Sequence, residues 1–424
     1  MDKIQLIKVL KSEIERSVGC TDPGAVCLAV RHAAKALGQK PERVEVTVSP
    51  NVYKNGMCVG VPGTGMRGLH IAAALGAVIG GEPGLAMLGR ASAADLAEAK
   101  SLLTRGMVSI AHSETSDPLY IKAQVMIEGH SACVVIANDY TNVVELTVDG
   151  IAVPVTAVNS GVPSQESLKG HSLEELFSTI NTMSSDDLAF LLDAAQVNRW
   201  AAYAGLASPA SVRLGTALSQ LPENLPASFR AATRAQCLTA AACEARMSGM
   251  PVPVIAIAGS GNHGIANFLG VLAVAEVLDS PKERLARALA ISSTVTIVIK
   301  GYASRLSAFC GCAVSAAAGV AAGTVYLLGG SYRDSVNAIQ SVIGTLAGMV
   351  CDGAKESCAF KLSSSVALAV QFSYLALDGA YVPAGMGILG GTIEKTFENL
   401  GRLNNPGMVA ADRLLMGMIT EGLS

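Results

Sequence analysis

Three cysteines in the last third of the chain have the chemistry to hold an iron–sulfur cluster. Cys312 lies among small apolar residues in CGCAVSAAAG, and Cys351 and Cys358 bracket the polar part of MVCDGAKESC. Three thiolates leave one iron of a [4Fe-4S] cluster without a protein ligand. Such an iron can bind a substrate directly and act as a Lewis acid rather than as an electron carrier. The three cysteines therefore predict an iron-dependent enzyme.

The spacing of these cysteines leaves alternatives open. Cys310 and Cys312 would point to opposite sides of a helix, so only one of them can face a cluster unless a helix begins there. We expect Cys312 as the ligand and keep Cys310 as the alternative. Cys351 and Cys358 would lie roughly 10 Å apart along a straight helix, so a helix end or loop near Gly353 must bring them together. Structural zinc is the competing interpretation, but the sequence has no paired CxxC knuckles.

Cys20, in VGCTDPG, is a candidate base or nucleophile. It stands directly before a predicted helix, whose dipole would lower the pKa of the thiol. A thiolate in that place can remove a proton or attack a substrate. The structural alternative is an inert, buried cysteine.

A glycine-rich segment, GSGNHG at Gly259–Gly264, matches the letters of a dinucleotide fingerprint. It follows the strand-like VPVIAIA, and a second strand-like run, STVTIVIK, comes later. That run ends at Lys300, where a nicotinamide site would need an acid. We therefore expect a bend into a helix N-terminus that holds a substrate carboxylate, with three residues in contact with the substrate: Gly261, Asn262 and His263.

A second polar loop, SPNVYKNGMCVGVPGTG, is also a candidate for substrate binding. It does not end in GK[ST], so it is not a phosphate-binding P-loop. Lys54 and Asn55 are the residues in it that we expect to contact an amino-acid substrate. The structural alternative is a hairpin-like turn after the preceding strand.

Composition narrows the class of protein. The chain has 424 residues, which suggests two or three domains, and its net charge of −3 gives no basic bias for nucleic acid. The N-terminal segment carries charges throughout and is not a signal peptide, so we expect a cytoplasmic protein whose ten cysteines are reduced. Two uncharged stretches, Ser248–Ala275 and Leu306–Tyr332, are long enough to cross a bilayer, but both lack aromatic belts. We expect buried core helices and no membrane span.

The order of the patterns predicts an α+β fold, with a small α/β-sheet unit inserted beside a larger, mostly α-helical catalytic domain. Two N-terminal helices in residues 1–40 should pack on the helical domain. Alternating apolar and polar residues predict strands within residues 41–165, which form the small α+β domain. Residues 166–424 are predicted to form a helical, cluster-binding domain.

Five segments together resemble the iron–sulfur L-cysteine desulfidases, which are related to the α-chain of iron–sulfur L-serine dehydratases. The segments are VGCTDPGAVCLA, SPNVYKNGMCVGVPGTG, GSGNHGI, FCGCAVSAAAG and GMVCDGAKESCAFK. The resemblance implies a [4Fe-4S] cluster on Cys312, Cys351 and Cys358, and Cys20 as the base. It implies β-elimination of L-cysteine to sulfide, pyruvate and ammonia. The chain lacks the cysteine-containing C-terminal tail of the serine dehydratases, which argues against serine as the preferred substrate.

Two other functions remain open at this point. The first is an L-serine dehydratase with the same cluster, and the second is a non-catalytic protein that binds a metal or small ligand through these cysteines. In either case we expect a small-molecule ligand and no nucleic acid. Large apolar helical surfaces are compatible with a homodimer.

Overall fold

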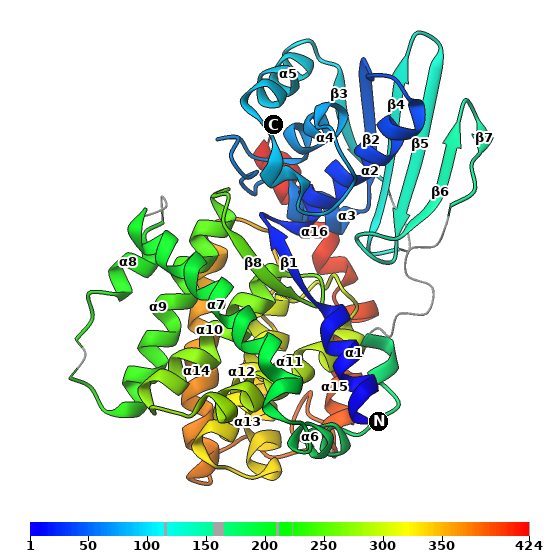
Figure 1. Ribbon diagram of the computed structural model, residues 1–424. Helices are drawn as coiled ribbons and strands as arrows, with labels where there is room; N and C mark the ends of the chain where they lie inside the picture. Colours follow the sequence, from blue (N-terminus) through cyan, green and yellow to red (C-terminus); the bar gives the residue numbers. More distant parts are fainter. Residues whose placement is uncertain (114–116, 156–164, 209–211, 223, 424) are drawn as a thin grey trace.

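The computed structural model describes residues 1–113, 117–155, 165–208, 212–222 and 224–423. Figure 1 shows a larger helical part below a smaller part built on a sheet, in agreement with the predicted α+β class. The N-terminus lies at the helical part, and the chain returns to the sheet part at its C-terminal end.

The sheet part has, within the described residues, a six-stranded sheet of order β3-β2-β4-β5-β6-β7. Only β2 and β3 pair in parallel; the other neighbours are antiparallel. Its elements are α2 (Thr21–Leu37), β2 (Arg43–Val48), α3 (Pro50–Gly56), α4 (Leu69–Val78), α5 (Ala93–Thr104), β3 (Val108–His112), β4 (Tyr120–Ile127), β5 (His130–Ala137), β6 (Val143–Val148) and β7 (Ile151–Ala152).

Side-chain burial alternates along β4, which shows that one face of the sheet packs on a core. Ile121, Ala123 and Val125 are fully buried, whereas Lys122 between them is exposed. A strand with period-two burial has one face on a core and the other toward water. Helices α2 and α4 pack against each other and against this sheet, and their side chains complete its core.

The helical part surrounds α10, in which residues 261–275 are all buried. This burial explains why residues 261–275, the second part of the uncharged stretch Ser248–Ala275, carry no charged side chain. The elements are α1 (Lys3–Glu13), α6 (Leu173–Asn181), α7 (Ser185–Ala207), α8 (Leu214–Leu218), α9 (Ala227–Met247), α10 (Gly261–Val277), α11 (Lys282–Ala303), α12 (Ala317–Leu328), α13 (Tyr332–Leu346), α14 (Cys358–Leu377) and α15 (Ile393–Arg402). The last helix, α16 (Val409–Leu423), lies beside α3 of the sheet part.

Small residues let these helices approach closely. At Gly319 of α12, an added Cβ would lie 2.4 Å from the carbonyl oxygen of Ser292 on α11. The Ala- and Gly-rich composition, with 4% aromatic residues, thus allows close contacts between helix backbones.

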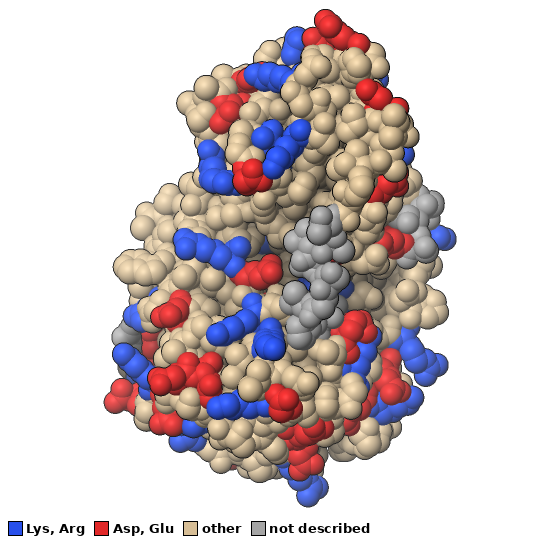
Figure 2. All heavy atoms as spheres, turned by 45° about the vertical axis from the view of Figure 1, so that its right-hand side comes forward, with Lys and Arg blue, Asp and Glu red and all other residues tan. Residues whose placement is uncertain are grey.

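Within the residues that the structure describes, two helices are long and apolar enough to cross a membrane by length and composition, α11 and α14. The apolar window of α11 is 89% buried and that of α14 is 50% buried. Buried core helices pass the same test, and α11 packs against α7, α10 and α12. On the face shown in Figure 2, basic and acidic side chains are interspersed over both parts of the molecule.

Three predictions about the elements are wrong. The helix Thr21–Leu37 packs on the sheet rather than on the helical domain, because its apolar side chains join the core of the sheet part. The run STVTIVIK lies inside α11 and not in a strand, since complete burial among helices overrides its β-branched propensity. The N-terminal helix, predicted over Lys3–Ser17, ends at Glu13, and β1 (Ile14–Val18) pairs antiparallel with β8 (Pro253–Ile257).

Candidate active site

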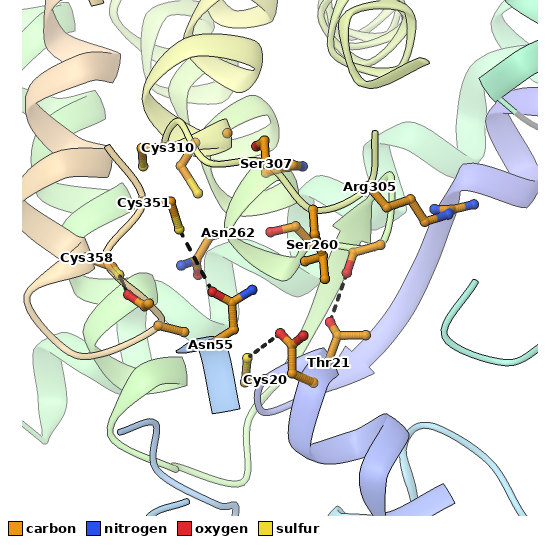
Figure 3. Close-up of a pocket in the computed structure, with 18 of the residues that line it drawn as sticks. Cys20, Thr21, Asn55, Ser260, Asn262, Arg305, Ser307, Cys310, Cys351 and Cys358 are labelled. Carbon is orange, nitrogen blue, oxygen red and sulfur yellow. Dashed lines mark hydrogen bonds between the residues drawn. The ribbon is translucent and has the colours of Figure 1, made fainter. Parts of the chain in front are cut away.

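A cavity of about 100 Å³ lies where the two parts meet. A single water needs about 10–15 Å³ of such space, so the cavity admits a small molecule. Segments far apart in the sequence meet there, as Figure 3 shows. The polar and thiol residues that line it include Cys20, Thr21, Asp22, Asn55, Tyr140, Arg246, Ser260, Asn262, His263, Lys300, Arg305, Ser307, Cys310, Cys312, Cys351 and Cys358.

Cys310 and Cys312 both line this cavity because a helix begins between them. A π-helical turn starts at Cys312 and leads into α12, so the two thiols are not held on opposite sides of one regular helix. The backbone N–H of Cys310 donates to the Met349 carbonyl at 2.7 Å. The N–H of Cys351 donates to the Ala308 carbonyl at 2.7 Å, which ties the two cysteine-bearing loops together.

Cys351 and Cys358 lie on the connection between α13 and α14, not along one helix. Cys358 is the first residue of α14, and its Sγ donates to the Gly353 carbonyl at 3.5 Å. Gly353 has φ of +90°, and a Cβ there would lie 2.3 Å from the Lys54 carbonyl oxygen. Only glycine fits this turn without strain, and the turn places both thiols on the cavity.

The surroundings of the three thiols predicted as ligands disfavour their thiolate forms. Burial raises the pKa of Cys351, and it raises the pKa of Cys358 to about 12. A hydrogen bond with Cys310 raises the pKa of Cys312, and the same bond lowers the pKa of Cys310 to about 7. Metal binding deprotonates coordinating thiols, so loading of this site would release protons.

The donors that the helical part brings to this cavity are four thiols, and thiolates are the ligands that hold iron–sulfur clusters. Among the described residues, no three His, Cys, Asp or Glu side chains lie close enough to hold one metal ion. A cluster needs a wider spacing, because each thiolate binds a different iron. Burial lowers the pKa of Lys300 to about 8, while Cys312 and Cys351 act in the opposite direction. Lys300 is thus a buried cation that can balance thiolate charge.

Cys20 precedes the first residue of α2, as predicted, but its pKa is not lowered. Burial raises the pKa of this thiol to about 12, and the nearby Asp22 charge adds to the rise. The Cys20 thiol donates to Oδ2 of Asp22 at 3.6 Å, and the Tyr140 hydroxyl donates to Oδ1 at 3.3 Å. Burial raises the pKa of Asp22 to about 6. The expected effect of the helix dipole is therefore outweighed by desolvation.

Asn55 and Lys54 take different places. Asn55 lines the cavity, and its Oδ1 accepts a hydrogen bond from the Cys351 thiol at 3.9 Å (Figure 3). Lys54 is 1% exposed and pairs with Asp412 of α16. The structure does not support Lys54 as a substrate-binding residue, because its ammonium group is held by a carboxylate outside the cavity lining.

The glycine-rich segment opens α10, and its side chains face the cavity. Asn262 and His263 line it, and Gly261 does not. His263 Nδ1 is 3.2 Å from the Ile257 carbonyl oxygen, and burial lowers its pKa to about 3. A neutral His263 that hydrogen-bonds to backbone is a poor general base. Since β8 pairs only with β1 in its sheet, and antiparallel, no βαβ unit for a nicotinamide cofactor surrounds this segment in the described structure.

Sequence reasoning missed several groups on this cavity. In the sequence, Asp22 can be recognised only as part of a helix start. Lys300 can be recognised only as a residue that stands where a nicotinamide site would need an acid. Arg246 lies near the end of α9 with no motif around it, so no local signal identifies it. Tyr140 follows a strand, and only the fold brings it to Asp22.

Comparison with known proteins decides the family. A family model described as serine dehydratase alpha chain matches residues 107–416. The chain belongs to this serine dehydratase α-chain family. The match covers the sheet strands from β3 onward and the thiol-bearing loops, so it includes most of the cavity lining. The family expected from the five sequence segments is confirmed at this level.

Relatives match over nearly the whole length. A UPF0597 protein of Methanocella arvoryzae is 63% identical over 421 residues, with 99% of each chain covered. UPF0597 protein TTE0269 of Caldanaerobacter subterraneus subsp. tengcongensis is 36% identical over 424 residues, with 99% of each chain covered. UPF0597 protein CD630_32320 of Clostridioides difficile is 36% identical over 423 residues, with 98% of this chain covered. These names describe no reaction.

Proposed function

We propose that the protein is an L-cysteine desulfidase that eliminates sulfide from L-cysteine with the help of a [4Fe-4S] cluster. One observation carries the proposal. The thiols of Cys312, Cys351 and Cys358, with Cys310 beside them, line the same cavity as the candidate base Cys20. Cluster ligands and a proton acceptor on one small cavity are the parts that such an elimination needs.

Cys20 and Asp22 would act together on the substrate proton. The thiol already donates to the Asp22 carboxylate. As Cys20 Sγ takes the proton from Cα of the substrate, its own proton passes to Oδ2 of Asp22. The pair then has the basicity of the carboxylate rather than that of the thiol, which suits proton transfer near neutral pH. Tyr140 holds the other oxygen of Asp22 and fixes its orientation.

The electrons of the Cα–H bond form the Cα=Cβ double bond, and the Cβ–S bond breaks with its electron pair on sulfur. A bound cluster would supply a Lewis-acidic iron for that sulfur. Cys312, Cys351 and Cys358 would hold the cluster, while Lys300 supplies nearby positive charge. The released aminoacrylate becomes pyruvate and ammonia by reaction with water.

An L-serine dehydratase is the second candidate, and the family match favours it. The same residues would serve, with the β-hydroxyl of serine in place of the thiol. Pyruvate formation from each substrate on a single preparation separates the two functions.

The deciding experiment is anaerobic reconstitution with iron and sulfide, followed by absorbance and by a sulfide-release assay with L-cysteine. We expect a brown protein that releases equal amounts of sulfide and pyruvate. A protein that takes up no iron under these conditions would overturn the proposal. A brown protein that forms pyruvate only from L-serine would replace it by the second candidate.

A further inference from the structure

Arg246 is a buried cation that lines the cavity without an acidic partner. Its side chain is 3% exposed, and no ion pair joins it to any carboxylate in the described part of the chain. Its Nη1 donates to Oδ1 of Asn262 at 2.9 Å, while its buried Nε has no hydrogen-bond partner among the described residues. An arginine is rarely buried unless it is paired. This guanidinium is therefore buried without a carboxylate partner.

The guanidinium lies against the first residue of α10. A Cβ added at Gly261 would lie 2.4 Å from Nε of Arg246 and 3.0 Å from Nη2. A side chain at this position would displace the guanidinium, so the glycine leaves room for Arg246 rather than for a dinucleotide. It explains why Gly261 stands in the segment without lining the cavity.

The N-terminus of α10 adds a second source of positive potential. The helix runs for 17 residues, and Ser260 before it makes no side-chain capping bond. The first N–H groups of an uncapped helix are free donors, and the helix dipole favours an anion there. Ser260 and Asn262 both line the cavity, so this helix end faces the same space as Arg246.

We propose that Arg246 and the first turn of α10 bind the α-carboxylate of the amino-acid substrate. A guanidinium offers two parallel donors that match the two oxygens of a carboxylate. The proposal rests on the proposed function, since it assumes an amino-acid ligand. Two buried lysines already have partners: Lys54 pairs with Asp412, and the Lys300 ammonium group donates to the Ser307 hydroxyl at 3.2 Å. Arg246 is thus a specificity-determining residue.

A competing role is electrostatic. Arg246 lies near enough to Cys20 and Asp22 to stabilise their negative forms. That role would alter turnover without any preference between ligands that differ only in the carboxylate. The test must therefore compare the binding of ligands with and without a carboxylate, and it must not depend on activity.

Calorimetric titration of the protein with L-alanine and with L-alaninamide makes this measurement. L-Alanine carries the carboxylate and the ammonium group but no leaving group, so binding is observed without elimination. L-Alaninamide replaces the carboxylate by a neutral amide. We expect the wild-type protein to prefer L-alanine, and Arg246→Gln to weaken L-alanine binding by about 10- to 100-fold with little effect on L-alaninamide.

Two further variants control this result. Arg234→Gln makes the same change on the same helix, but Arg234 pairs with Glu276 and does not line the cavity, so the preference should remain. Arg246→Lys keeps the charge and should retain part of the preference. Circular dichroism establishes that each variant is folded.

Equal binding of the two ligands by the wild-type protein, or an unchanged preference in folded Arg246→Gln, would overturn the inference. A different result would contradict the proposed function. In that case the reconstituted protein releases no sulfide from L-cysteine, while the Arg246-dependent preference for L-alanine persists.

Discussion

The environment of the buried Asp22 carboxylate suits it to proton transfer. It accepts hydrogen bonds from a thiol and a phenol, and no lysine or arginine is ion-paired with it in the described structure. Burial raises the pKa of this carboxyl group to about 6, so the group gains or loses its proton close to neutral pH. A proton acceptor needs such a value.

Asp22→Asn should lower kcat/KM by at least about 100-fold, because an amide cannot take the proton from Cys20. In the wild-type protein kcat/KM should fall as the pH drops below about 6, when Asp22 becomes protonated. A pH–rate profile with L-cysteine measures both effects. If the Asp22→Asn variant kept the acid limb of the wild-type profile, another group would control it.

The same substitution should stabilise the fold above pH 6. The folded-state pKa of Asp22 is about 6, and its ordinary value is 3.8. Ionisation is therefore disfavoured in the folded state, and stability is lost as the pH rises from 3.8 to 6. Asp22→Asn removes this cost, so we expect up to about 3 kcal/mol of added stability at about pH 8 and little at about pH 4. Urea denaturation at the two pH values tests the sign.

Serine variants of the cavity cysteines should fall into two groups, which differ in their colour after reconstitution and in their activity. Cys20→Ser should keep the brown colour after reconstitution and lose turnover, because a serine hydroxyl is a far weaker proton acceptor. Cys351→Ser and Cys358→Ser should lose both. Cys133→Ser, on β5 and outside the cavity lining, is the matched control and should lose neither. Near-full activity of Cys20→Ser would remove Cys20 as the base.

At the scale of elements, α16 ties the end of the chain to the sheet part. It packs beside α3 (Figure 1). Asp412 of α16 pairs with Lys54, a lysine that is 1% exposed. The pair fixes α3, which carries Asn55 into the cavity. The conformation of the cavity thus depends on a helix that contributes no residue to its lining.

Asp412→Asn should destabilise the protein by about 3 kcal/mol, since it leaves the Lys54 ammonium group buried without its carboxylate. The double variant Lys54→Met with Asp412→Leu removes both charges and should recover most of that loss. Urea denaturation compares the three proteins. If Asp412→Asn is as stable as the wild type, the ion pair does not hold α16 in place.

The elements show what sequence patterns can and cannot predict. Helices such as Leu173–Asn181 and strands such as Tyr120–Ile127 follow from local periodicity, and the structure has them. Gly353 likewise predicts the loop between Cys351 and Cys358. By contrast, the direction of the Lys54 side chain depends on Asp412, which is 358 residues away in the sequence. Arg246 becomes a candidate binding residue only because α9 packs against α10. Such contacts leave no local trace in the sequence.

At the scale of the whole molecule, the cavity belongs to both parts. Cys20, Asp22 and Asn55 come from the N-terminal segments, and the thiols from the helical part. Arg67 of the sheet part pairs at 2.6 Å with Glu356, which lies in the loop that carries the last two thiols. Thr21 Oγ1 donates to the Gly259 carbonyl at 2.9 Å. These contacts hold the two parts together around the site.

The lining of the cavity begins at Cys20 and ends at Cys358, and its support extends to Asp412. A nascent chain leaving the ribosome therefore cannot form the site from its early segments. Any cofactor that needs all of these thiols has to be inserted after synthesis is nearly finished. Cells that make the chain faster than they can supply the cofactor would accumulate a folded, colourless precursor.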